Sequence, residues 1–174
     1  ITSKGKAAQT MSTETPRKSS GRDTTIHFLR YGLPVFTVMA AIFAVSQMSA
    51  STISDSSAAD SATSVFGGFT DEIAHFAEYF VLSALVMRWI LAVNVPSGTG
   101  ELDPAMFSSA GQKATLLAVL YAISDETHQW FIDGRSAQLL DLLIDGVGAM
   151  MGTAVYLSVF QAWRLQRNKG DGSQ

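Results

Sequence analysis

Two long stretches without charge constrain this chain most strongly. Each runs for 18 residues without Asp, Glu, Lys, Arg or His, one at 31–48 and the other at 146–163. Because roughly 20 helical residues cross a ~30 Å hydrocarbon core, both stretches predict transmembrane helices. A hydrophobic fraction of 47% would also suit a soluble domain, so the distribution of apolar residues, rather than their amount, indicates a membrane protein.

Two further apolar stretches are less complete. Residues 79–93 are interrupted only by Arg88, and residues 114–124 are 11 uncharged residues. The latter give about 16 Å of helix, which spans a membrane only if the helix continues through the polar turn at 125–129. We predict an all-α integral membrane bundle of four transmembrane helices near residues 26–48, 71–93, 113–131 and 139–163.

The remaining segments predict tails and loops. Residues 1–25 are rich in Ser, Thr and Lys and predict a disordered cytoplasmic tail, followed by a membrane domain at 26–163 and a second cytoplasmic tail at 164–174. Residues 49–70 and 94–112, the latter containing Asp103 and Pro104, predict loops. The chain has no cysteine, which excludes a disulfide scaffold and a thiolate zinc site. A net charge of −3 gives no reason to expect a nucleic-acid partner.

Lysine and arginine are distributed unevenly between the predicted tails and loops. With four spans, both tails and the loop between the second and third helices share one side of the membrane. Eleven of the 12 basic residues fall on that side, and only Arg135 falls on the other. Because cytoplasmic flanks carry an excess of Lys and Arg, both termini are predicted to be cytoplasmic. The eleven are Lys4, Lys6, Arg17, Lys18, Arg22, Arg30, Arg88, Lys113, Arg164, Arg167 and Lys169.

Ionisable residues gather at the outward ends of the last three predicted helices. Within each helix their spacing places them on one face, as at i, i+4 and i+7 in the second helix. Polar groups at membrane depth are costly, so they are expected to face one another and to mark a functional site. They are Asp71, His75 and Glu78 on the second helix, Asp125, Glu126, His128 and Gln129 on the third, and Asp141 and Asp145 on the fourth.

The acidic face of the fourth predicted helix continues into a strip of small residues. Gly148 and Gly152 follow Asp145 on that face at helical spacing. A small-xxx-small strip lets another helix approach closely, so this face is expected to point into the bundle. The same strip, or the first helix, is also a candidate contact for other membrane-protein subunits.

The same residues carry a resemblance to a known family. The segments Thr70–Leu85 and Ala122–Gly152 resemble the VanZ-like family, small multi-pass bacterial membrane proteins named after a glycopeptide (teicoplanin) resistance determinant. The family pattern joins Asp-x-x-x-His-x-x-x-Tyr to Asp-Glu-x-x-Gln-x-Phe, a Gly-Arg turn, and an Asp before a Gly-x-x-x-Gly helix. Matching positions are Asp71, His75, Tyr79, Asp125, Glu126, Gln129, Phe131, Gly134, Arg135, Asp141, Gly148 and Gly152.

This resemblance implies a multi-pass protein of the bacterial cell membrane. Three positions differ from the family pattern: Glu72, Asp133 and Asp145 stand where basic, proline and asparagine residues are usual. These differences make the cluster more acidic and disfavour an anionic ligand. The candidate site, catalytic or binding, is an outward-opening pocket formed by Asp71, His75, Asp125, Glu126, Gln129, Arg135 and Asp141.

The pattern leaves several functions open. His75 and Glu78 could form a general base with its orienting partner, and two histidines with carboxylates could bind Zn²⁺, Mn²⁺ or Fe. No cofactor is identified by the sequence, and the polar groups could also serve only to join helices. Either the pocket binds or acts on a cell-envelope substrate, or the chain is an accessory subunit packed against a larger membrane complex. Arg135 is expected to bridge to Asp125, Glu126 or Asp141.

Overall fold

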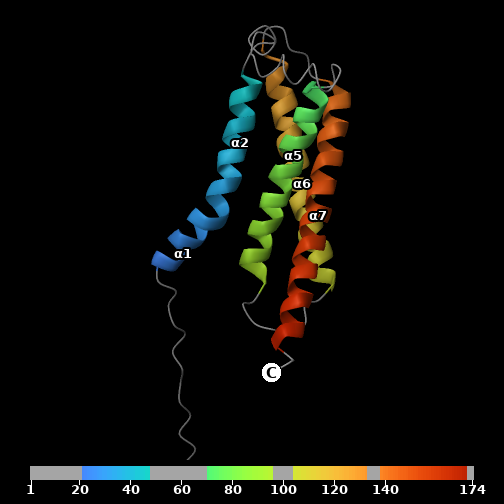
Figure 1. The fold of residues 1–174 in the computed structure, drawn as a ribbon. Helices are drawn as coiled ribbons and strands as arrows, with labels where there is room; N and C mark the ends of the chain where they lie inside the picture. Colours follow the sequence, from blue (N-terminus) through green and yellow to red (C-terminus); the bar gives the residue numbers. More distant parts are fainter. Residues whose placement is uncertain (1–20, 48–69, 96–103, 133–137, 172–174) are drawn as a thin grey trace, which may run out of the picture.

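The computed structural model describes residues 21–47, 70–95, 104–132 and 138–171, and every regular element within these ranges is a helix. The first membrane helix is built from three consecutive pieces, and three long helices follow it (Figure 1). This arrangement confirms the predicted all-α bundle. The elements are α1 (Gly21–His27), η1 (Phe28–Gly32), α2 (Leu33–Ser46), α5 (Thr70–Asn94), α6 (Pro104–Gln129) and α7 (Leu139–Asp171).

Three of the described helices are long and apolar enough to cross a membrane. They cover Thr24–Ser46, Asp71–Asn94 and Leu139–Arg167. The fourth long helix, α6, is not among these three, but its 26 residues run unbroken through the polar turn at 125–129. At 1.5 Å per residue α6 is about 39 Å long, and it packs against both α5 and α7.

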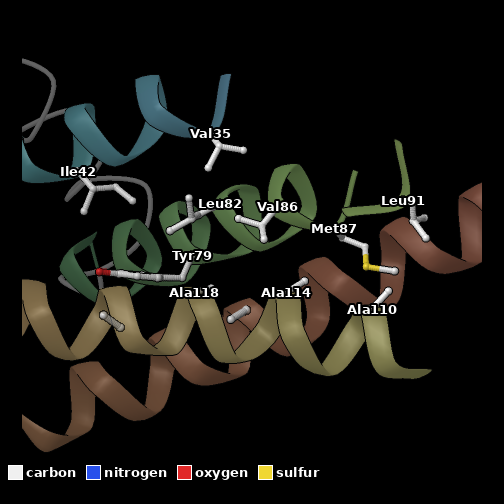
Figure 2. Packing of buried hydrophobic residues seen from close by; sticks show 12 residues of the cluster. Val35, Ile42, Tyr79, Leu82, Val86, Met87, Leu91, Ala110, Ala114 and Ala118 are labelled. Atoms are coloured by element: carbon white, nitrogen blue, oxygen red, sulfur yellow. The ribbon is translucent and has the colours of Figure 1, made fainter. Parts of the chain in front are cut away.

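Helix α6 contributes mainly small apolar residues to the fully buried interior of the bundle. Its inner face carries an alanine every four residues, at 110, 114, 118 and 122, and all four are buried (Figure 2). Larger side chains from α2 and α5 fill the space opposite, including Ile42, Leu82 and Met87. The same face of α6 continues into Asp125, Glu126 and Gln129, which are also buried. The alanine stripe therefore leads directly into the polar end of the bundle.

Large apolar side chains lie on the outside of the bundle. On α6, Leu116, Leu117 and Leu120 are each more than half exposed, while the alanines face inward. A soluble helix would have the opposite arrangement, since burial of large apolar side chains drives folding in water. Small residues inside and large apolar residues outside are typical of helices packed within a bilayer.

Two glycines bring α7 unusually close to α5. A Cβ atom added at Gly148 would lie 2.5 Å from the carbonyl oxygen of Phe76, and one added at Gly152 would collide with the carbonyl oxygen of Phe80. The predicted small-residue strip thus forms the contact between α5 and α7 within this chain. A partner subunit would have to use another face.

The helix boundaries differ from the prediction in three places. The third helix begins at Pro104 instead of 113, so the loop predicted at 94–112 is wrong over its second half. Proline favours the first turn of a helix because its missing N–H would have no intrahelical partner there. The last helix continues to Asp171, through most of the predicted tail. Helix α1 begins at Gly21, inside the other predicted tail, and residues 1–20 and 48–69 lie outside the described residues.

A short π-helix explains how the first membrane helix accommodates Pro34. The N–H of Leu33 bonds the carbonyl of Phe28, five residues earlier, where η1 joins α2. Proline removes one backbone donor and its ring crowds the carbonyl four residues before it, which a wider turn relieves. After this turn, α2 lies against α5, whereas α1 diverges from the bundle (Figure 1).

Four helix ends meet at one end of the bundle. The last residues of α2 and α6 and the first residues of α5 and α7 lie there, while α7 ends at the opposite end (Figure 1). This end contains the ionisable residues singled out in the sequence. The opposite end holds Arg30 in η1, Arg88 late in α5 and Arg167 late in α7.

Candidate functional site

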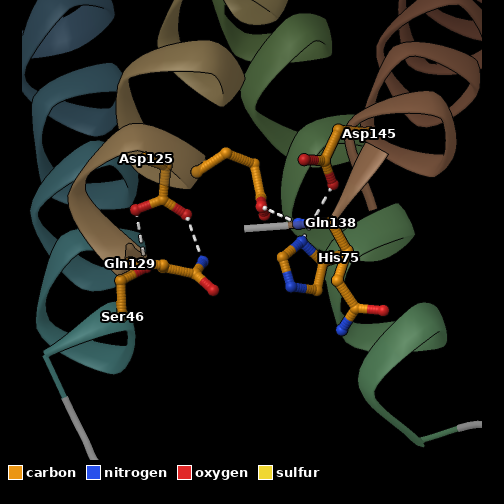
Figure 3. Close-up of polar contacts among 7 residues, drawn as sticks. Ser46, His75, Asp125, Gln129, Gln138 and Asp145 are labelled. Atoms are coloured by element: carbon orange, nitrogen blue, oxygen red, sulfur yellow. Dashed lines mark hydrogen bonds and ion pairs between the residues drawn. The ribbon is translucent and has the colours of Figure 1, made fainter. Parts of the chain in front are cut away.

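A histidine of α5 and an aspartate of α7 form a buried pair at this end. Nδ1 of His75 lies 3.1 Å from Oδ1 of Asp145 (Figure 3). Because an ionised carboxylate only accepts hydrogen bonds, Nδ1 carries the proton. Asp145 is only 1% exposed. Asp145 is therefore a hydrogen-bond partner of His75, a role for which the sequence offered Glu78.

Two more carboxylates approach His75 from the neighbouring helices. Ligating atoms of His75, Glu126 and Asp141, on α5, α6 and α7, all lie within 4.8 Å of one another. One oxygen of Glu126, Oε2, accepts a hydrogen bond of 3.0 Å from the backbone N–H of Gln138, just before α7 (Figure 3). We call His75, Glu126, Asp141 and Asp145 the histidine–carboxylate cluster.

A second group joins the first membrane helix to α6. Ser46, in the last turn of α2, donates a hydrogen bond of 2.6 Å to Oδ1 of Asp125. Gln129, one turn further along α6, donates to Oδ2 of the same carboxylate at 3.1 Å (Figure 3). All three residues are buried. This network ties the C-terminal end of α2 to the bundle, and it accounts for both oxygens of Asp125.

The histidine of α6, His128, lies apart from the cluster. Nε2 of His128 is 2.9 Å from the amide nitrogen of Gln47, and its ring packs against Phe43 with centroids 4.9 Å apart. His128 therefore faces the end of α2 rather than α7. A metal site built from both histidines is not formed by the described residues.

Several buried polar atoms near the cluster have no hydrogen-bond partner among the described residues. These atoms are Oε1 of Glu126, Oδ2 of Asp145 and the hydroxyl oxygen of Tyr79, one turn after His75 on α5. A buried polar atom without a partner costs free energy. In the described structure the cluster is therefore incomplete, and a ligand could supply the missing contacts.

The structure brings together most, but not all, of the residues expected to share a site. His75, Glu126 and Asp141 meet, and Asp125 and Gln129 form the adjacent group. Asp71 is exposed on the first turn of α5 and belongs to neither group. Arg135 lies outside the described residues, so its bridge to a carboxylate stays a prediction.

Two residues of the site, Asp145 and Ser46, were not among the seven site residues predicted from the sequence. Asp145 was placed on the face of Asp141, but its contact with His75 depends on how closely α5 and α7 approach. Nothing in the sequence marked Ser46 as a site residue, because a serine at the end of an apolar helix is common. Its role follows from the side-by-side packing of α2 and α6, which periodicity within one helix does not specify.

The chemistry available at this end is that of a histidine and carboxylates at membrane depth. A neutral histidine with its proton on Nδ1 keeps a lone pair on Nε2, which can accept a proton or bind a metal. The three carboxylates of the cluster can accept hydrogen bonds from a ligand or offset its positive charge. Within the described chain, no lysine or arginine pairs with these three carboxylates.

Taken together, the helices and this buried cluster define an all-α membrane protein with an ionisable group of residues at one end. Residues 4–161 match the VanZ/LLP1 protein family, and the chain belongs to that family. The comparisons with curated proteins and with solved structures found no match.

Proposed function

We propose that this protein lies in the bacterial cytoplasmic membrane and binds a component of the cell envelope at its histidine–carboxylate cluster. The observation that carries the proposal is the convergence of buried polar side chains from α5, α6 and α7 at one end of the bundle. Intramembrane ionisable residues are costly and by default indicate function.

The orientation follows from the basic residues. The cluster lies at the end opposite to Arg30, Arg88 and Arg167. Basic flanks favour the cytoplasm, so the cluster faces outward and both termini are cytoplasmic. Arg88 lies 4.9 Å from the ring centre of Tyr31, as expected for a cation held near the inner interface.

The acidic character of the cluster indicates the chemistry of the ligand. Glu126, Asp141 and Asp145 accept hydrogen bonds, and each adds negative charge when ionised. A lipid-linked or peptidic envelope compound with an ammonium, amide or hydroxyl group fits such a site. The negative charge of the three carboxylates would repel an anionic ligand.

Glycopeptide susceptibility tests this function. In a susceptible bacterium lacking its own relative, expression of the wild-type chain should change teicoplanin susceptibility, and Glu126→Gln or His75→Ala should abolish that change. His128→Ala is the matched control, since it removes a histidine from the same end but outside the cluster. Membrane abundance is measured for every variant. Full activity of Glu126→Gln at normal abundance would contradict the proposal.

A second function is favoured by the first membrane helix. Phe36 and Phe43 on α2 are 47% and 48% exposed, which gives the helix an aromatic outer face. An accessory subunit would pack such a face against a larger membrane complex. Purification in mild detergent separates the two functions: a stoichiometric protein partner favours the accessory subunit, and a lone monomer or dimer favours the binding site.

A further inference from the structure

We infer that His75, Glu126 and Asp141 bind a divalent transition-metal ion, with Asp145 as the residue that positions His75. The inference deepens the proposed function and rests on it for its biological meaning. Zinc binding can nevertheless be measured without any envelope compound, so the two can fail separately.

The geometry of the three residues supports a single ion between them. Their ligating atoms lie within 4.8 Å of one another, although they come from three helices. Zinc–nitrogen and zinc–oxygen bonds are about 2.1 Å long, so tetrahedral ligands stand about 3.4 Å apart. The ligand atoms must therefore move closer by no more than about 1.4 Å to hold one ion.

An unpartnered buried oxygen gives an independent reason for a cation. Glu126 is 6% exposed, and its Oε1 finds no hydrogen-bond donor among the described residues. Its other oxygen, Oε2, is fixed by the backbone N–H of Gln138. A carboxylate held in this way keeps one oxygen for a ligand, and a divalent ion is the strongest partner that oxygen can have at membrane depth.

Asp145 holds the ring of His75 in place through its hydrogen bond to Nδ1. Histidines that bind metals usually donate their other N–H to a carboxylate, which fixes the ring and its tautomer. Here Nδ1 of His75 donates to Asp145 over 3.1 Å in a buried contact. The lone pair of His75 is then on Nε2, as metal binding requires.

The donor set indicates the class of metal. One imidazole and two carboxylates suit Zn²⁺, Mn²⁺ or Fe²⁺, and three protein ligands leave a position open for water or another ligand. Zn²⁺ is the most suitable probe because it lies high in the affinity order for such ligands and undergoes no redox change. An open position would let an envelope compound reach the ion directly.

The test measures zinc on the purified full-length protein. The affinity tag is removed, metal is stripped with a chelator, ZnCl₂ is added in excess, and unbound metal is removed by desalting. We expect the wild type to retain one zinc ion per chain by elemental analysis, with a higher midpoint of thermal unfolding than the stripped protein.

Three variants identify the ligands and the positioning residue. Asp141→Asn is the primary variant because Asp141 is only half-buried, so its loss disturbs packing least. We expect Asp141→Asn and Glu126→Gln each to lower zinc affinity at least tenfold. Asp145→Asn should lower it by about 10- to 100-fold while keeping the stoichiometry, as loss of an outer-shell partner does.

His128→Ala provides the matched control, since it removes the histidine of α6, which lies near the same end but outside the cluster. It should retain zinc as the wild type does. Absence of zinc from the wild type, or equal loss of zinc in His128→Ala and Asp141→Asn, would overturn the inference. A teicoplanin effect without zinc binding overturns the metal site alone. Zinc binding without any teicoplanin effect overturns the proposed function alone.

Discussion

His75 of α5 and Asp145 of α7 are joined by a buried hydrogen bond beside a close approach of their two helices. Phe76, the next residue after His75, presents its carbonyl oxygen to Gly148, one turn after Asp145. The glycine allows the two backbones to approach, and the approach brings the histidine within 3.1 Å of the aspartate. The histidine–carboxylate cluster therefore depends on the small-residue strip, which allows α5 and α7 to come close enough for this hydrogen bond.

Gly152 tests the close contact between α5 and α7. A methyl group at this position would collide with the carbonyl oxygen of Phe80 and with the hydroxyl of Ser83. We expect Gly152→Ala to destabilise the protein by about 1–3 kcal/mol, the usual cost of overpacking a well-filled interior. Thermal unfolding in detergent, followed by circular dichroism, measures the change.

Gly146 on the same helix is the control for this substitution. A Cβ atom there would have no atom within 4 Å. Gly146→Ala should leave stability unchanged or raise it by up to about 1 kcal/mol, because alanine favours a helix more than glycine does. If both alanine variants unfold at the same temperature, α7 does not approach α5 as closely at Gly152 as in this structure.

Ser46 tests how the first membrane helix is held. Its hydroxyl donates to the buried carboxylate of Asp125 over 2.6 Å. Ser46→Ala leaves that oxygen of Asp125 without its donor, so we expect a loss of about 1–3 kcal/mol in the free energy of unfolding. Ser158→Ala, which removes a hydroxyl bonded only to its own helix, should have an effect within about 0.5 kcal/mol. Equal effects would refute the interhelical role of Ser46.

The orientation in the membrane can be tested with single cysteines, since the chain has none of its own. Gln47 is exposed at the end that holds the cluster, and Arg167 is exposed at the opposite end. We expect an impermeant maleimide to label Gln47→Cys in intact cells and Arg167→Cys only after the membrane is opened. The reverse pattern would show that the cluster faces the cytoplasm.

The existence of the helices could be predicted because it follows from local properties of the chain. Uncharged runs of membrane length predicted the helices that became α2 and α7, and helical spacing predicted the glycine strip. The start of α6 was missed because Asp103 and Pro104 read as a turn. Pro104 instead occupies the first position of a helix, where it costs no hydrogen bond.

The composition of the site was harder to predict because it depends on contacts between helices. Asp71 and His75 share one face of α5, yet only His75 reaches the cluster, since Asp71 lies in the exposed first turn. Ser46 and Asp125 are 79 residues apart and meet only because α2 packs on α6. Periodicity shows which residues share a helix face, but not which face a neighbouring helix presents.

The stability of Glu126→Gln tests most directly whether the cluster is a ligand site or only joins helices. The amide oxygen of glutamine can still accept the hydrogen bond from Gln138. The substitution removes the negative charge of the carboxylate and replaces its unpartnered oxygen with an amide nitrogen. If the cluster is a ligand site, the metal-free variant should unfold in detergent at the same temperature as the metal-free wild type, or at a higher one, because residues kept for function cost stability. A midpoint lower by several degrees, as expected for a loss of about 2 kcal/mol or more, would contradict the account and indicate that Glu126 serves to hold the helices together.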